Sequence, residues 1–152
     1  MKIVPYDQKY KDIFIKMNKQ WISEMFTLEE EDIRVLSHIE QSIAKGGQVF
    51  FALDDHDEVL ACCMIVPLCN GEWELEKFCA RGMSTRTGAG TACLKACIDY
   101  AHEMGAEKIV IVSNRRCEQA IRLYRRFGFI ETPVDQEKFP FDRADIAFEM
   151  IL

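Results

Sequence analysis

Residues 84–105 read STRTGAGTACLKACIDYAHEMG. From Ala89 onward the apolar residues recur at the i, i+3, i+4, i+7 spacing of one helix face, and Gly105 supplies a helix end. Gly88 and Gly90 stand at the start of this run, where glycine permits a sharp turn or the close approach of a ligand. The stretch therefore predicts a glycine turn that opens a regular helix.

The segments on both sides of this helix read as strands. Residues 72–80, EWELEKFCA, follow an Asn-Gly turn, and residues 108–112, KIVIV, are a short continuous apolar run typical of a buried parallel strand. A strand, a glycine turn, a helix and a strand make a βαβ unit, for which a right-handed crossover is expected.

The rest of the chain extends this unit to an α+β fold with a mixed sheet. Before it, the pattern predicts a strand ending near Pro5, a helix capped by Asp7, and one helix over about residues 28–44 with Ile33 on its apolar face. A hairpin of QVFFAL and EVLACCMIVPL follows. After the unit come a helix ending at Gly128 and two closing strands, FGFIET and ADIAFEMIL. With no linker or repeat, residues 1–152 are expected to form a single domain.

Composition excludes several classes of protein. With 49% hydrophobic and 29% charged residues, the chain has globular rather than disordered composition. A formal charge of −6 argues against a general nucleic-acid binder, because phosphate contacts need a basic face. No apolar run approaches the roughly 18 residues of a membrane span, and the first residues lack a signal-peptide core. We expect a cytoplasmic protein with no nucleic-acid or membrane partner.

The seven cysteines are expected to be reduced thiols. Their number is odd, and several lie inside apolar segments. A metal site is not predicted, because there is no Cys-x-x-Cys pair and the three histidines lie far apart in the sequence.

The glycine turn has two interpretations. It is either a tight connection with nothing bound or a cradle for an anion, since the first amides of a helix lack internal partners and the helix dipole is positive there. No Lys-Ser or Lys-Thr follows the glycines as in a P-loop, and the third glycine and acidic residue of a dinucleotide fingerprint are missing. As an anion cradle the predicted contacts are Thr85, Arg86, Thr87, Gly88, Ala89, Gly90 and Thr91.

Residues 74–114, ELEKFCARGMSTRTGAGTACLKACIDYAHEMGAEKIVIVSN, followed by AIRLYRRFGF, resemble the GNAT superfamily of acetyl-CoA-dependent N-acetyltransferases. The late segment FDRADIAFEM is similar to the closing hairpin of small bacterial members. The resemblance implies a mostly antiparallel central sheet with one splayed parallel strand pair, helices on both faces, and acetyl-CoA as co-substrate. The sequence departs from the family at Thr85, where Arg or Gln is usual, and at Arg86-Thr87, where Gly-Lys is usual.

The resemblance also assigns catalytic roles. Glu74 and Glu76 alternate along a predicted strand, so both can face one side. Glu74 falls where many relatives carry a base, acting directly or through water, and its pKa would have to rise from about 4.3. Glu76, or no role beyond a solvated strand face, is the alternative. Tyr124 matches a tyrosine near the cofactor sulfur that protonates the leaving thiolate, or it is a core aromatic.

Further cofactor contacts follow from the same resemblance. The main chain of Phe78, Cys79 and Ala80 is expected to bind the pantetheine arm and to stabilise the oxyanion. Asn114 matches a recurrent asparagine that contacts the cofactor arm, and a plain turn or helix cap is the alternative.

The sequence thus predicts an acyl-CoA-dependent N-acyltransferase. It would move an acetyl group directly, in a ternary complex, to a primary amine of a small molecule or peptide. The first helices and the late loop, with Trp21, Phe26 and Phe139, are expected to contact this acceptor. The alternative is a non-catalytic acyl-CoA sensor or interaction module with the same fold. Many small relatives pair as homodimers, but the sequence specifies no contact and leaves the acceptor open.

Overall fold

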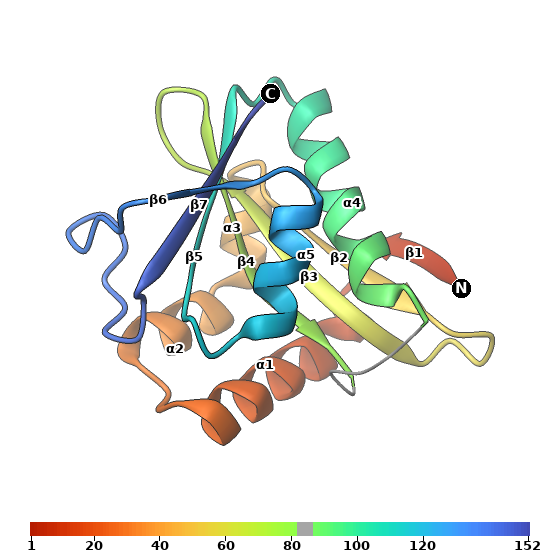
Figure 1. Ribbon diagram of the computed structural model, residues 1–152. Helices are drawn as coiled ribbons and strands as arrows, with labels where there is room; N and C mark the ends of the chain where they lie inside the picture. The colour runs from red at the N-terminus through yellow and green to blue at the C-terminus, as the bar shows by residue number, and fades with distance from the viewer. Residues whose placement is uncertain (82–86) are drawn as a thin grey trace.

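The computed structural model describes residues 1–81 and 87–152 (Figure 1). Its strands form one seven-stranded sheet in the order β1-β2-β3-β4-β5-β7-β6. The pair β4–β5 is parallel and the other neighbouring pairs are antiparallel. The strands are β1 (Lys2–Pro5), β2 (Gln48–Leu53), β3 (Val59–Pro67), β4 (Glu72–Ala80), β5 (Lys108–Ser113), β6 (Ile130–Thr132) and β7 (Ile146–Ile151).

Helices cover both faces of this sheet. The helices α1, α2 and α3 lie on one face, and α4 and α5 lie on the other (Figure 1). This arrangement confirms the predicted mixed α+β fold with a parallel pair in a mostly antiparallel sheet. The helical elements are the short 3-10 turn η1 (Gln8–Tyr10), α1 (Lys11–Met25), α2 (Glu30–Ser37), α3 (Ile39–Ala44), α4 (Ala89–Glu103) and α5 (Glu118–Arg126).

The strand β3 shows why its sequence is apolar without interruption. Cys62 and Met64 belong to the hydrophobic core beneath α1–α3, whereas Ala61, Cys63 and Ile65 belong to the core beneath α4 and α5. A strand that is buried on both faces has no solvent side to which polar residues could be assigned. The cysteines on this strand are free, fully buried thiols.

The predicted single helix over residues 28–44 is wrong in one respect. The chain breaks at His38 (φ −130°, ψ 36°), so that α2 and α3 are separate helices. The break is stabilised locally, because His38 donates its backbone N–H to Val35 and its Nδ1 lies 2.7 Å from the carbonyl oxygen of Arg34. Of the predicted apolar positions, Leu36 and Ile39 are buried, whereas Ile33 is 49% exposed.

Candidate active site

The parallel strands β4 and β5 pair over only three residues. The ladder joins Glu72 to Lys108, Trp73 to Ile109, and Glu74 to Val110, and ends there. Beyond this point β4 continues to Ala80 and stays paired with β3, so its β5 side is free of sheet partners within the described ladders. The two strands therefore separate toward their carboxyl ends, as the family resemblance implied.

A β-bulge near the end of β4 changes the faces to which its side chains point. Met64 pairs with Glu76 and Cys62 pairs with Cys79, so Cys63 faces two residues, Lys77 and Phe78. Lys77 takes the left-handed conformation, with φ 52°. The bulge turns Lys77 toward α2, where it meets a buried carboxylate, and Phe78 toward the core under α4 and α5.

A cavity of about 500 Å³ fills the space between the separated strands. Its walls come from both sides of the sheet. On one side they include Gly88 and Gly90 of the glycine turn together with Tyr124 of α5, and on the other side Trp21 and Phe26 at the end of α1. The cavity thus connects the glycine turn to the α1–α2 side through the opening in the sheet.

The amino-terminal end of α4 borders this cavity at Gly88, Gly90 and Thr91. The first intrahelical bond runs from the Ala92 amide to the Gly88 carbonyl, so the amides of residues 89–91 precede the helical ladder. The Ala89 amide donates to the Thr87 hydroxyl at 3.3 Å. Gly88 has φ 76°, and a Cβ atom built on it would meet nothing within 4 Å. Gly88 is therefore required for backbone conformation and leaves the space in front of the helix open.

Gly90 has a different role. A Cβ atom at this position would lie 3.1 Å from Cζ of Phe78, tighter than an ordinary van der Waals contact. The absence of a side chain lets the first turn of α4 pack directly on β4. The predicted contacts Thr85 and Arg86 lie outside the described residues.

Two arginines missed by the sequence analysis line the same half of the cavity. Arg122 and Arg126 are four residues apart on α5, so they lie on one face of the helix. Both are exposed, and within the described ranges neither forms an ion pair with a carboxylate. The four-residue spacing of these arginines can be read in AIRLYRRFGF, but the sequence analysis assigned a role only to the tyrosine of that motif. Together with the positive end of the α4 dipole, the two arginines make this half of the cavity cationic.

Glu74 lies where the strands part. It is 8% exposed, lines the cavity and forms the last pair of the β4–β5 ladder. Burial raises the pKa of Glu74 well above its ordinary value, and the neighbouring charge of Glu76 raises it further, while Lys77 acts in the opposite direction. Glu76 also lines the cavity, on the same side of the strand, as the alternation of the sequence predicts.

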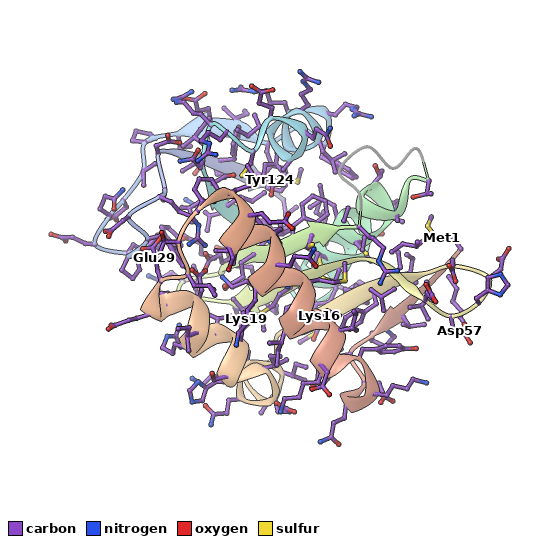
Figure 2. The ribbon with its side chains drawn as sticks, turned by 90° about the horizontal axis from the view of Figure 1, so that it is seen from below. Met1, Lys16, Lys19, Glu29, Asp57 and Tyr124 are labelled. Atoms are coloured by element: carbon purple, nitrogen blue, oxygen red, sulfur yellow. The ribbon has the colours of Figure 1, made fainter. Side chains whose placement is uncertain are left out.

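Tyr124 lies between α5 and the sheet (Figure 2). Its ring packs against Phe78, Phe129 and Phe148 at centroid distances of 6.2, 6.2 and 5.7 Å, and it also lines the cavity. Burial raises the pKa of its hydroxyl, so the phenol stays protonated and able to donate. The two interpretations of Tyr124 are thus compatible.

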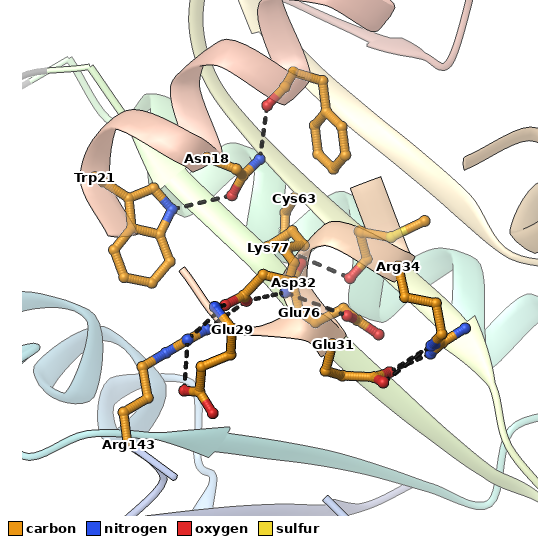
Figure 3. A network of polar contacts seen from close by, with 12 residues as sticks. Asn18, Trp21, Glu29, Glu31, Asp32, Arg34, Cys63, Glu76, Lys77 and Arg143 are labelled. Atoms are coloured by element: carbon orange, nitrogen blue, oxygen red, sulfur yellow. Dashed lines mark hydrogen bonds and ion pairs between the residues drawn. The ribbon is translucent and has the colours of Figure 1, made fainter. Parts of the chain in front are cut away.

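A buried ionic network lies beside the opposite half of the cavity (Figure 3). Asp32 is fully buried; it accepts hydrogen bonds from Lys77 Nζ at 3.1 Å and from both terminal nitrogens of Arg143 at 2.7 and 2.6 Å. Arg143 also reaches Glu29 at 3.0 Å. Burial alone would raise the pKa of Asp32, but the Arg143 hydrogen bonds and the Lys77 charge outweigh it and lower that pKa. The network ties α2, the β4 bulge and the late loop together.

Asn114 and Cys79 also border the cavity. Asn114 donates to the Arg143 carbonyl at 2.7 Å, and its side-chain oxygen accepts from the Arg116 amide at 2.9 Å. These are the contacts of a turn, the alternative that the sequence left open. The Cys79 thiol donates to the Met17 carbonyl at 3.7 Å, and among the described lining residues there is no histidine to activate it.

The described residues contain no group of three His, Cys, Asp or Glu side chains arranged to hold a metal ion. Within residues 1–81 and 87–152 no helix combines the length and the apolarity that crossing a bilayer requires.

The cavity thus crosses an opened parallel pair, with the start of α4 at one end and a buried carboxyl group beside it. The chain belongs to the acetyltransferase (GNAT) family, whose model matches residues 14–129. A search of the curated proteins found no match.

Solved structures with this fold cover the whole chain. A GNAT-family acetyltransferase from Staphylococcus aureus Mu50 is 20% identical and superposes with a TM-score of 0.88 over 99% of this chain and 98% of that one. An acetyltransferase from Streptococcus agalactiae 2603 is 16% identical, with a TM-score of 0.84 over 99% and 98%. The PaiA N-acetyltransferase from Thermoplasma acidophilum, solved in complex with coenzyme A, is 13% identical, with a TM-score of 0.74 over the full length of both chains.

Proposed function

We propose that this chain, as one domain over residues 1–152, transfers an acetyl group from acetyl-CoA to a primary amine within a ternary complex. One observation carries the proposal: the cavity passes through the sheet at Glu74, with a cationic half toward α4 and a carboxylate-bearing half toward α1. An anionic donor and an amine acceptor can then enter from opposite sides and meet at the opening.

The residues of the cationic half fit an acetyl-CoA molecule. The amides of Gly90 and Thr91 would bind its diphosphate, Gly88 leaves room for it, and Ala89 remains a proposed contact. Arg122 and Arg126 would add charge-assisted contacts to its phosphates, and Thr85, Arg86 and Thr87 remain proposed contacts. The free side of β4 at Phe78, Cys79 and Ala80, with Asn114 opposite, would hold the pantetheine arm. Bound acetyl-CoA supplies an activated acetyl thioester.

Glu74 is proposed as the base. An amine attacks only when it is uncharged, so an ammonium acceptor must first lose a proton. A carboxylate with an ordinary pKa is too weak a base for this step, whereas the buried Glu74 has a raised pKa and reaches the cavity floor. It can take the proton directly or through one water.

Tyr124 is proposed as the acid. Its protonated hydroxyl belongs to a ring held by three aromatic neighbours, so the donor is fixed in place beside the cavity. The hydroxyl would donate to the departing thiolate. A main-chain amide on the free side of β4, between Phe78 and Ala80, would stabilise the oxyanion as the acyl group is transferred.

Two measurements on the same protein test the proposal. Acetyl-CoA should raise the melting temperature more than ATP or NAD, because a ligand that binds only the folded state stabilises it. Release of free CoA with a panel of primary amines should then exceed the release without amine. Stabilisation by acetyl-CoA with no amine-dependent release would instead identify a non-catalytic acyl-CoA sensor.

A further inference from the structure

We propose that the acceptor is a dication: beside the reacting amine it carries a second ammonium group, as in an alkyl diamine or a longer polyamine. The inference rests on the proposed transfer to an amine and concerns the half of the cavity that faces α1. Glu24 at the mouth would hold the second ammonium group, while Glu74 and Glu76 on the floor receive the reacting amine.

The cations of this half are already neutralised. Lys77 and Arg143 line the cavity, and both bind Asp32, which is fully buried behind the wall. Arg143 also binds Glu29, and Lys77 Nζ lies 3.8 Å from Glu76. Both cations are therefore engaged by carboxylates of the protein.

Two further cations, Arg34 and Arg116, lie close by and outside the lining. Arg116 donates to the Met25 carbonyl at 2.8 Å, and its guanidinium lies 5.0 Å from the centroid of the Phe26 ring. Arg34 is hydrogen-bonded to Glu31, which raises the pKa of Arg34, and the charges of Glu74 and Glu76 raise that pKa further. With Arg34 and Arg116 counted, four cations stand against six carboxyl groups. The carboxyl groups are those of Glu24, Glu29, Glu31, Asp32, Glu74 and Glu76.

Glu24 lies beside an aromatic ring, that of Trp21. Trp21 and Glu24 are three residues apart on α1, so they are neighbours on its surface, and both line the cavity. The indole N–H donates to Asn18 Oδ1 at 3.0 Å (Figure 3). The indole ring meets the Phe26 ring edge-on, with centroids 6.5 Å apart. A carboxylate beside a fixed aromatic ring is a favourable site for an ammonium group.

The same arrangement disfavours an acceptor with a carboxylate near its amine. Such a group would need an unengaged cation in this half, where the lining cations Lys77 and Arg143 are bound by Asp32 and Glu29. It would also face Glu24 and Glu76 at close range. The charge distribution thus selects for a second positive charge and against a negative one.

The test compares acceptors of equal length. Alkyl diamines of three to six carbons, the matching monoamines and the matching ω-amino acids are assayed for CoA release with saturating acetyl-CoA. At the best length, kcat/KM for the diamine should exceed that for the monoamine by about tenfold, and the amino acid should be poorest. The preference for the diamine should shrink at high salt, because an exposed carboxylate is screened. Monoamines equal to diamines at every length would overturn the proposal.

A variant pair assigns the preference to Glu24. Glu24→Gln should reduce the ratio of diamine to monoamine kcat/KM several-fold. Glu30→Gln, which removes the same charge from an exposed residue of α2 outside the lining, should leave the ratio unchanged. An unchanged ratio in Glu24→Gln would also overturn the proposal.

A binding measurement separates this inference from the proposed function. Calorimetry of the same amines with the protein–CoA complex needs no turnover. Selective binding of the diamine without CoA release would contradict the transferase and retain the dication site. CoA release with equal binding and turnover of diamines and monoamines would retain the transferase and eliminate the dication site.

Discussion

Lys77 Nζ lies 3.1 Å from Oδ1 of Asp32, and both side chains are almost completely removed from solvent. This pair joins the bulge of β4 to the first turn of α2. Lys77 occupies the left-handed region with φ 52°, a conformation that a residue with a long side chain keeps only when its surroundings fix it. The ion pair with Asp32 and the Phe141 ring, 5.0 Å from Nζ, supply that constraint. The bulge that opens the cavity therefore depends on a charge in another element.

Asp32→Asn should be among the most destabilising polar substitutions in this chain. It leaves Lys77 and Arg143 without their common counter-charge, and breaking a buried pair from one side costs about 3–5 kcal/mol. The free energy of unfolding in urea measures the loss. Because the pKa of Asp32 is lowered, its contribution is present above the unfolded pKa of about 3.9 and is lost as the pH falls through the folded value.

Asp55→Asn is the matched control for this loss. Its carboxylate is 95% exposed and lies 3.9 Å from the chain's amino terminus, so the change should stay within about 0.5 kcal/mol. Equal effects of the two substitutions would mean that the buried network contributes nothing specific.

Glu74→Gln should lower kcat with acetyl-CoA by about 10²–10⁴-fold if Glu74 is the base, and should change the KM for acetyl-CoA much less. In the wild type, the acid limb of the kcat/KM profile should lie above the ordinary carboxyl range, because burial raises the pKa of Glu74. Glu76→Gln removes a carboxylate from the same strand face. Loss of turnover in Glu76→Gln with full activity in Glu74→Gln would reverse the assignment.

The same Glu74→Gln variant should be more stable than the wild type at neutral pH. The folded state favours the protonated form of Glu74, so ionising it opposes folding. Below about pH 4.3 the carboxyl is protonated in both states and the two proteins should differ little. As the pH rises toward the folded pKa, the difference in unfolding free energy should grow and then level off. A difference that is constant with pH would show that Glu74 is not perturbed.

The fold was predictable because local signals and burial agree along most of the chain. The Asn70-Gly71 turn has positive φ angles at both residues, and Gly128 with φ 98° follows the last helix, as their sequence context indicates. The break between α2 and α3 was not predictable from periodicity, because His38 stabilises it by contacts with its own helix turn. The helical spacing of apolar residues continues across the break, from Leu36 to Ile39 and Ile43.

The site was predictable where its chemistry follows a motif, and not where it depends on distant residues. Glu74 and Tyr124 stand in recognisable segments, and both reach the cavity. Asp32 gave no such signal, since an acidic residue at a helix start ordinarily satisfies the helix dipole. A sign of the bulge was present in β4, however. Trp73 and Leu75 alternate on the face that packs under α4 and α5, so regular alternation would place Lys77 on that face as well. The next apolar residue is Phe78 instead, and this displacement by one position marks the extra residue of the bulge.

Gly90→Ala should destabilise the protein by about 1–3 kcal/mol, because the added methyl group would overpack the contact between α4 and β4. The new Cβ atom would lie 3.1 Å from the Phe78 ring. Phe78→Leu in the same chain should relieve the contact, so the double variant should lose less stability than the two single changes together. If the losses of unfolding free energy in urea are strictly additive, the methyl group of Gly90→Ala does not clash with Phe78.

Tyr124→Phe keeps the aromatic ring among Phe78, Phe129 and Phe148 and removes only the hydroxyl. The melting temperature should therefore change little, while kcat falls by about 10²-fold or more if the hydroxyl protonates the leaving thiolate. Tyr100→Phe is the control, since its hydroxyl donates to the Gly46 carbonyl away from the cavity. Full activity in Tyr124→Phe would leave Tyr124 a core residue only.

Arg126→Ala should weaken acetyl-CoA binding by roughly twofold to fivefold, because one exposed ion pair with a phosphate is lost. The effect should fade with added salt, since the guanidinium is exposed and screened. Arg125→Ala is the matched control: its guanidinium pairs with Glu131 at 3.0 Å and does not line the cavity. Calorimetric titration with acetyl-CoA at two ionic strengths measures both variants. If Arg125→Ala weakens acetyl-CoA binding as much as Arg126→Ala, the contribution of Arg126 to the affinity comes from the overall charge of α5. If neither changes it, the phosphates of acetyl-CoA are held by the α4 amides alone.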